Sequence, residues 1–123
     1  MVAISFSVFK DKILDGTKRQ TIRPLRKRSF NVGDNLQLYW HMRQKDCEKL
    51  QDETCVEVFS IHLVHRVVIR IREFEPLNQI LNYAETTDLA RRDGFSSVAE
   101  MFDWFEKQYG QRLKSLTFQI IRW

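Results

Sequence analysis

Alternating apolar and polar positions divide much of this 123-residue chain into β-rich stretches. These stretches are residues 2–6, 35–42, 54–72 and 116–123. In the second, Leu36, Leu38 and Trp40 share one face because side chains alternate along a strand. The third is too long for one ordinary strand, and its apolar positions change parity between Val58 and Phe59, which predicts a bulge or a bend. Such a bend curls a sheet toward a barrel.

Helical patterns occur in two parts of the chain. Near the N-terminus, we expect Ser7 to cap a helix over residues 8–15 and Gly16 to end it in the left-handed conformation. The second part precedes the last β-rich stretch and predicts three helices. The first is short, begins at Pro76 and contains Leu77, Ile80 and Leu81. The second runs from Thr86 or Thr87 to Arg92. The third begins with a Ser97/Glu100 capping box and has an apolar stripe formed by Val98, Met101, Phe102, Phe105 and Tyr109.

This order of elements predicts the fold class. Strands first, helices inserted late and a final strand are typical of an α+β domain, here a small mixed β-barrel with helices inserted before the last strand. A chain of this length buries enough surface for a real core, so we expect a single domain over residues 1–123. The polar residues 44–53 are expected to form a long hairpin loop or excursion.

Positive charge is concentrated near the N-terminus. The formal net charge is +4, yet residues 10–28 alone hold eight Lys or Arg against Asp11 and Asp15, a local charge of +6. One-sided positive charge indicates an anionic partner, and nucleic acid is the commonest one. The alternative is a solvated basic face that only keeps the protein soluble.

Other classes of function find little support. Two cysteines, Cys47 and Cys55, are too few for a disulfide framework. Together with His62 and His65 they could be drawn as a zinc site, but the two cysteines lack the short spacing of a zinc knuckle. No Gly-rich phosphate loop is present. We therefore expect no metal and no cofactor. Since no apolar run reaches about 18 residues and no basic-then-apolar leader is found, we expect a cytoplasmic protein without a membrane span.

The candidate functional stretch is residues 16–23, Gly-Thr-Lys-Arg-Gln-Thr-Ile-Arg. In a strand that ends at Pro24, Thr21 and Arg23 share a face, while Lys18 lies in the turn that leads in. An amine, a hydroxyl and a guanidinium on one surface can meet an oxyanion, a phosphate or a polar base edge. The alternative is a loop whose polar residues are merely solvated.

Two further residues are candidates on physical grounds. Asp93 precedes Gly94 at an expected helix C-terminus, where the helix dipole opposes a carboxylate by about 0.3–1 kcal/mol. A locally disfavoured residue is a candidate for function, although an Asp-Gly turn on the surface is the alternative. Tyr39 lies on the polar face of its strand and is a candidate for base stacking, whereas Trp40 is expected in the core.

Several segments, taken in order, resemble the ASCH domain family. They are Ile13-Leu14-Asp15-Gly16, Lys18-x-x-Thr21-Ile22-Arg23, Val32-Gly33-Asp34, Ala90-x-x-Asp93-Gly94-Phe95 and Phe118-x-x-Ile121-Arg122-Trp123. The resemblance covers nearly the whole chain. It implies the PUA-like fold, a small β-barrel with helices that is related to RNA-binding modules. It also implies a cleft between the Lys-x-x-Thr-x-Arg strand and the helical insertion.

The resemblance implies possible catalytic roles as well. In bacterial relatives that hydrolyse 4-acetylcytidine, a Lys and a Thr at this spacing act with a Glu from the insertion. Carried over, Lys18 is the base, Thr21 the nucleophile and Asp93 the orienting carboxylate, while Arg23 holds the anionic intermediate. This chain departs from the pattern in having Asp, one methylene shorter than Glu, and in its basic loop over residues 26–28.

Two functions follow as hypotheses. In the first, which we favour, the chain is a PUA-like RNA- or nucleotide-binding domain without a cofactor. Phosphate would be bound by Arg23, Arg26, Lys27 and Arg28, and a base pocket would be lined by Lys18, Thr21, Tyr39 and Asp93. In the second, the chain is a small amidohydrolase of an acylated nucleoside. A ribonuclease and a protein-interaction module remain further alternatives.

Overall fold

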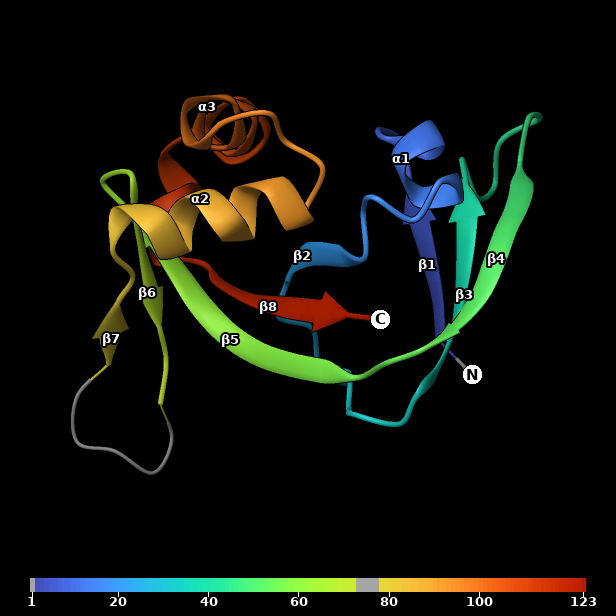
Figure 1. Ribbon diagram of the computed structural model, residues 1–123, viewed down its shortest axis with the longest axis horizontal. Coiled ribbons are helices and arrows are strands. Elements are labelled where there is room, and N and C mark those ends of the chain that lie inside the picture. The colour runs from blue at the N-terminus through green and yellow to red at the C-terminus, as the bar shows by residue number, and fades with distance from the viewer. Residues whose placement is uncertain (1, 73–77) are drawn as a thin grey trace.

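The computed structural model describes residues 2–72 and 78–123 (Figure 1). The elements are β1 (Val2–Phe6), α1 (Lys10–Leu14), β2 (Gln20–Pro24), β3 (Asn35–Trp40), β4 (Glu48–Thr54), β5 (Glu57–Val64), β6 (Val67–Arg70), β7 (Gln79–Ile80), α2 (Tyr83–Arg92), α3 (Val98–Tyr109), the 3₁₀ helix η1 (Gly110–Ser115) and β8 (Thr117–Arg122). The predicted α+β class is confirmed, and so is the insertion of helices before the last strand. Within the described ranges, no helix is long and apolar enough to cross a membrane.

The strands form two sheets, in the orders β1-β3-β4 and β2-β8-β5-β6-β7. β1 and β3 are parallel, whereas β2 runs antiparallel to β8 at the edge of its sheet, as Pro24 at the strand end predicts. β4 and β5 follow one another with only Cys55 and Val56 between them, so this strongly curved stretch joins the two sheets (Figure 1). The predicted bend therefore exists, three residues earlier than the parity change between Val58 and Phe59 indicates.

The predicted small mixed β-barrel is not closed among the described residues, whose strands form two separate sheets. In the part of the chain that the structure describes, β1 and β2 lie in separate sheets and share no ladder of backbone hydrogen bonds. A side chain bridges them instead, since the Arg23 guanidinium on β2 donates to the Ser5 carbonyl on β1 at 2.6 Å. The two sheets thus curl toward each other and leave a seam between β1 and β2.

β8 contributes to two hydrophobic cores. Phe118 and Ile120 are completely buried in a cluster beneath α2 and α3. Ile121 and Trp123 belong to a second cluster, which includes Ile13 of α1 and the apolar side chains of β1 and β3. Because neighbouring side chains of a strand point to opposite faces, one strand can supply both cores.

The first helix differs from its prediction. It begins at Lys10 and not at residue 8, and Ser7 does not cap it. Phe9 occupies the cap position in the left-handed conformation, at φ 64°, with no side-chain hydrogen bond to the helix. Gly16 follows the helix at φ 83°, as predicted.

The region before α2 also differs. Ile80 was expected in a short helix but lies in β7, paired with Ile69 of β6, while Pro76 and Leu77 of that expected helix lie outside the described residues. α2 begins at Tyr83, earlier than predicted, because Asn82 caps it. The Asn82 side chain accepts a hydrogen bond from the Glu85 backbone N–H at 2.8 Å, and the Glu85 carboxylate accepts one from the Asn82 N–H.

Three other predictions are refined. Residues 44–53 are not all loop, because Glu48–Thr54 forms β4 against β3. His65 and Arg66, both at positive φ, form the tight turn between β5 and β6. Ser97 caps α3 through the Glu100 N–H, but the Glu100 carboxylate contacts Ser96, so only half of the expected capping box is present.

These caps give a test of the fold. We expect Asn82→Ala to lower the free energy of unfolding by about 1 kcal/mol, because it leaves the Glu85 N–H without its partner. Ser7→Ala is the matched control, and it should change stability by less than about 0.5 kcal/mol since Ser7 caps nothing. Urea denaturation of both variants measures this. A larger loss for Ser7→Ala would contradict the observed start of α1.

Candidate functional site

Four polar residues meet at a small pocket between the N-terminal strands and the helical insertion. They are Lys18, Thr21, Arg23 and Asp93. These are the four residues to which the resemblance assigns catalytic or anion-binding roles, and the structure brings all four together. Lys18, Thr21 and Asp93 are each at most 5% exposed.

Local structure explains how the motif reaches the pocket. The backbone N–H of Lys18 donates to the Lys12 carbonyl of α1 at 2.9 Å, so the turn after Gly16 folds back on the helix. Thr21 and Arg23 then share a face of β2, as their spacing predicts. The Arg23 Nε donates to the Thr21 Oγ1 at 3.0 Å, which ties the two side chains together.

Lys18 and Asp93 form a buried pair across 75 residues of sequence. The Lys18 ammonium donates to the Asp93 backbone carbonyl at 2.5 Å and lies 3.4 Å from its Oδ2. Asp93 is the C-cap residue of α2, where a cation is favoured near the last carbonyls of the helix. One ammonium therefore interacts with both the helix end and the carboxylate that sequence analysis found disfavoured there.

Burial changes the acidity of this site. Desolvation lowers the pKa of Lys18, against the opposing effect of the Asp93 charge, and the nearby Arg23 lowers it further. Desolvation also lowers the pKa of Arg23 and raises that of Tyr109, which lies in the same pocket. With Lys18 and Arg23 charged against Asp93, the four polar groups carry one net positive charge.

Gln20 is a site residue that sequence analysis missed. It is fully buried, and its Nε2 donates to the Asp93 Oδ1 at 3.2 Å and to the Leu89 carbonyl at 3.1 Å. Its Oε1 accepts from Arg122 Nε at 2.9 Å. Gln20 thus orients the Asp93 carboxylate and connects it to β8. Its position between Lys18 and Thr21 could have indicated a role in the site. Its hydrogen-bond partners, however, lie in segments far away in the sequence, so the sequence does not reveal them.

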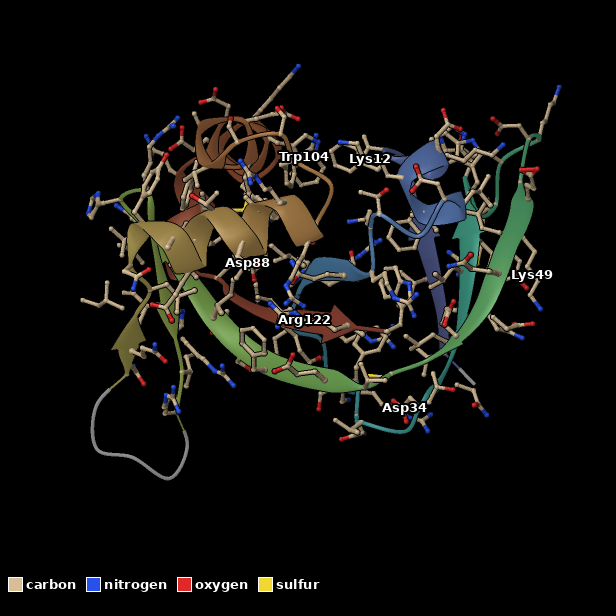
Figure 2. All side chains as sticks on the ribbon, in the orientation of Figure 1. Lys12, Asp34, Lys49, Asp88, Trp104 and Arg122 are labelled. Atoms are coloured by element: carbon tan, nitrogen blue, oxygen red, sulfur yellow. The ribbon has the colours of Figure 1, made fainter. Side chains whose placement is uncertain are left out.

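Aromatic side chains form much of the remaining pocket wall. They are Phe6, Phe9, Phe95, Trp104, Phe105 and Tyr109, and they line it together with Ser5, Ser7, Val8 and Ile22. Phe9 and Phe95 meet edge to face with ring centroids 5.1 Å apart, and the Lys18 amine lies 5.6 Å from the centroid of the Phe9 ring. Figure 2 shows Trp104 projecting from α3 toward α1. Phe105 and Tyr109 belong to the apolar stripe that the sequence predicts for α3, so this stripe supplies pocket residues as well as core residues.

The helix end and Phe9 approach one another closely. Gly94 has φ 105°, and a Cβ at this position would lie 2.8 Å from Phe9 Cδ2. The Lys12 amine also donates to the Gly94 carbonyl. Only glycine suits this contact, because it has both the required φ and the required space.

The pocket is small. Its volume is about 90 Å³, whereas sites that enclose a drug-sized ligand measure roughly 300–1,000 Å³. It can therefore receive one ring or one small polar group, and the remainder of a larger ligand would lie outside.

The other predicted site residues lie elsewhere. Arg26 stacks on the Phe30 ring at 4.2 Å, and it lines a different hollow together with Arg28. Lys27 is exposed in the same loop. Tyr39, half-buried on β3 opposite Ser5, is not among the described residues that line the pocket. Arg26, Lys27, Arg28 and Tyr39 thus lie outside the lining of the pocket that contains Lys18, Thr21, Arg23 and Asp93.

Across residues 2–72 and 78–123, no group of three or more His, Cys, Asp or Glu side chains is placed to hold a metal ion. Cys55 is buried and Cys47 exposed, and both are free thiols. Comparison of the chain with models of protein families, with curated proteins and with solved structures gives no significant match.

We expect Gln20→Leu to destabilise the fold by at least about 2 kcal/mol, because it leaves buried partners, among them the Asp93 carboxylate, without a hydrogen bond. Gln111→Leu makes the same chemical change at an exposed position and should stay within about 0.5 kcal/mol. Chemical denaturation compares the two. Equal effects would show that the Gln20 network contributes nothing specific.

Proposed function

We propose that this chain is a PUA-like domain of the ASCH type that binds RNA or a nucleotide by placing one base in the pocket. The observation that carries this proposal is the meeting of Lys18, Thr21, Arg23 and Asp93 in one aromatic-lined pocket. The curled sheets and the Arg23 bridge across the β1–β2 seam support the PUA-like assignment.

The hydrogen-bond inventory of the pocket favours a ligand with acceptor atoms. A Lys ammonium has three N–H donors; one donates to the Asp93 carbonyl and the Asp93 carboxylate lies 3.4 Å away, so at least one donor is left for a ligand. The Thr21 hydroxyl already accepts from Arg23, which leaves its O–H to donate. Ring carbonyls, ring nitrogens and phosphate oxygens all offer the matching acceptors.

The aromatic wall and the volume favour a base. Stacking of a base on an aromatic side chain contributes about 1–3 kcal/mol, and it tolerates every base because each has a π-face. A pocket of about 90 Å³ suits a single ring, with the sugar and phosphate at its mouth. The net positive charge of the polar groups favours such an anionic neighbour.

Thr21→Val tests the proposal, because it preserves shape while removing the hydroxyl. We expect it to weaken the binding of a nucleoside or a short RNA about tenfold, the effect of one lost hydrogen bond to a ligand. Thr117→Val, on β8 outside the pocket lining, is the control and should bind normally. Titration calorimetry at low salt measures both. Absence of binding to any nucleoside or RNA would overturn the proposal.

One observation favours a second candidate, hydrolysis of 4-acetylcytidine. Lys18 can act as a base only when neutral, and burial lowers its pKa in that direction. In the hydrogen bonds of the described residues, however, Lys18 contacts Asp93 and not the Thr21 hydroxyl that it would have to deprotonate. The resting geometry thus suits holding a ligand better than attacking one.

The two functions predict opposite pH effects. As pH rises through the lowered pKa of Lys18, which lies below its usual value of about 10.4, the ammonium loses its charge. Binding that uses the ammonium should then weaken, whereas hydrolysis that uses the neutral amine should accelerate. Affinity and 4-acetylcytidine turnover, followed from about pH 6 to about pH 10, distinguish them.

Lys18→Met is the control for this pH series, because it should remove the pH dependence in either case. Turnover that survives Thr21→Val unchanged would exclude Thr21 as the nucleophile. Affinity that stays constant with pH in the unmodified protein would exclude the ammonium as a ligand donor.

A further inference from the structure

A second and larger hollow lies on the other face of the five-stranded sheet. Its volume is about 590 Å³, within the range of sites that bind ligands. Its floor includes Ser60 of β5 and Gln119 of β8, which pair with each other. Because Ile61 and Phe118 beside them point into the core beneath the helices, Ser60 and Gln119 point away from it.

One wall of this hollow is the loop between β2 and β3, and it is firmly attached. The Gln119 Oε1 accepts from the Phe30 N–H at 3.1 Å, and its Nε2 donates to the Phe30 carbonyl at 3.2 Å. Gln119 is only 6% exposed, and Arg26 covers the Phe30 ring. A buried amide that satisfies both backbone groups of one residue holds the loop in place.

The opposite wall carries positive charge. Arg70 lies over the Phe59 ring at 4.1 Å, and Arg72 donates from its backbone N–H to the Asn78 side chain. No carboxylate is among the described residues that line this hollow. The Phe59 ring positions the Arg70 guanidinium, and the Arg72 guanidinium donates to the Gln79 side-chain carbonyl, so this wall presents two positioned cations and favours an anionic ligand.

A neighbouring hollow of about 280 Å³ extends the basic surface. The two hollows share Ser29 and Asn31, and the smaller one adds Arg26, Arg28 and the single carboxylate of Asp34. The Asp34 carboxylate already accepts from the Asn31 N–H at 2.9 Å. We call the two hollows together the arginine groove, lined by Arg26, Arg28, Arg70 and Arg72 with Ser29, Asn31 and Ser60.

We propose that the arginine groove binds the sugar-phosphate backbone of single-stranded RNA. Guanidiniums bind phosphates bidentately, and Ser and Asn side chains are common partners of phosphate and sugar. The cores of protein–protein interfaces instead favour large aromatic residues and are depleted in Ser, which argues against an acidic protein as the occupant. The inference rests on the proposed function only in that the chain binds RNA.

The groove and the base pocket lie on different sides of the molecule. Figure 2 shows Trp104, which lines the pocket, above the curved strand β5 and Asp34, which lines the groove, below it. Arg26 and Arg28 thus bind the backbone away from the pocket and not beside it. A free nucleoside can occupy the pocket alone, whereas an RNA strand long enough to pass around the sheet reaches both.

Salt dependence tests the groove. For single strands, log K falls with log salt with a slope of about −0.7 per phosphate contact. The double variant Arg28→Gln/Arg70→Gln should therefore flatten the slope by about 1.4 and weaken binding at low salt. Arg91→Gln/Lys107→Gln removes the same charge from exposed positions on α2 and α3 and should keep the slope. Fluorescence anisotropy with a labelled RNA oligonucleotide provides the measurement.

The single variant Arg28→Gln keeps the test valid if the double variant does not fold. Arg28 is exposed, so its replacement should leave stability unchanged while it flattens the salt slope by about 0.7. Circular dichroism checks the fold of each variant. Thr21→Val should lower RNA affinity at every salt concentration without changing the slope, since it removes no charge.

The outcomes separate the two proposals. If RNA binds with an unchanged slope in the groove variants, or if only a nucleoside binds, the groove is overturned and the base pocket stands. If the salt dependence of RNA binding flattens in the groove variants, but no nucleoside binds and Thr21→Val has no effect, the base pocket is overturned and the arginine groove is supported. Competition by an acidic peptide as strong as that by RNA would also overturn the groove as an RNA site.

Discussion

The buried contact between Lys18 and Asp93 is the interaction on which the site depends. It joins the turn before β2 to the end of α2, which lie 75 positions apart in sequence. Removing one partner of a buried ion pair typically costs about 3–5 kcal/mol, because the other charge is left uncompensated. Because breaking the contact would leave a buried charge without a partner, it fixes the end of α2 against the turn before β2. The position of the helical insertion relative to β2 therefore depends on it.

Gln20 makes this arrangement possible. A buried carboxylate needs hydrogen bonds beyond its ion pair, and Gln20 supplies one to the Asp93 Oδ1 while it binds Arg122 through its own carbonyl. Arg122 in turn pairs with Glu57 at 2.8 Å. The charges of the pocket are therefore continuous with a chain of polar contacts through β8 to β5.

The seam between the sheets gives Arg23 a second structural role. It binds the Ser5 carbonyl across the seam, contacts the Phe6 ring at 4.9 Å and donates to Thr21. The guanidinium is thus both the link between β1 and β2 and part of the pocket. Two of its five N–H donors are used in these hydrogen bonds, so a ligand in the pocket would be held by the remaining ones.

The sequence by itself determined the local features. Alternation predicted β1 and β8, Gly16 follows its helix at positive φ as predicted, and the spacing of Thr21 and Arg23 put both on one face of β2. These features depend on a few neighbouring residues, and periodicity records them directly. The α+β class and the position of Asp93 at a helix end follow from the same kind of local pattern.

Only the tertiary structure decided which distant segments meet. It buried Gln20 against Asp93, turned Phe105 and Tyr109 toward the pocket, and placed Arg26 in a different hollow from the pocket that contains the Lys-x-x-Thr-x-Arg motif. The two sheets stayed open because β1 and β2 are bridged by a side chain and not by a ladder. Strand pairing and the direction of a bend result from packing over the whole chain, and no local pattern contains that information.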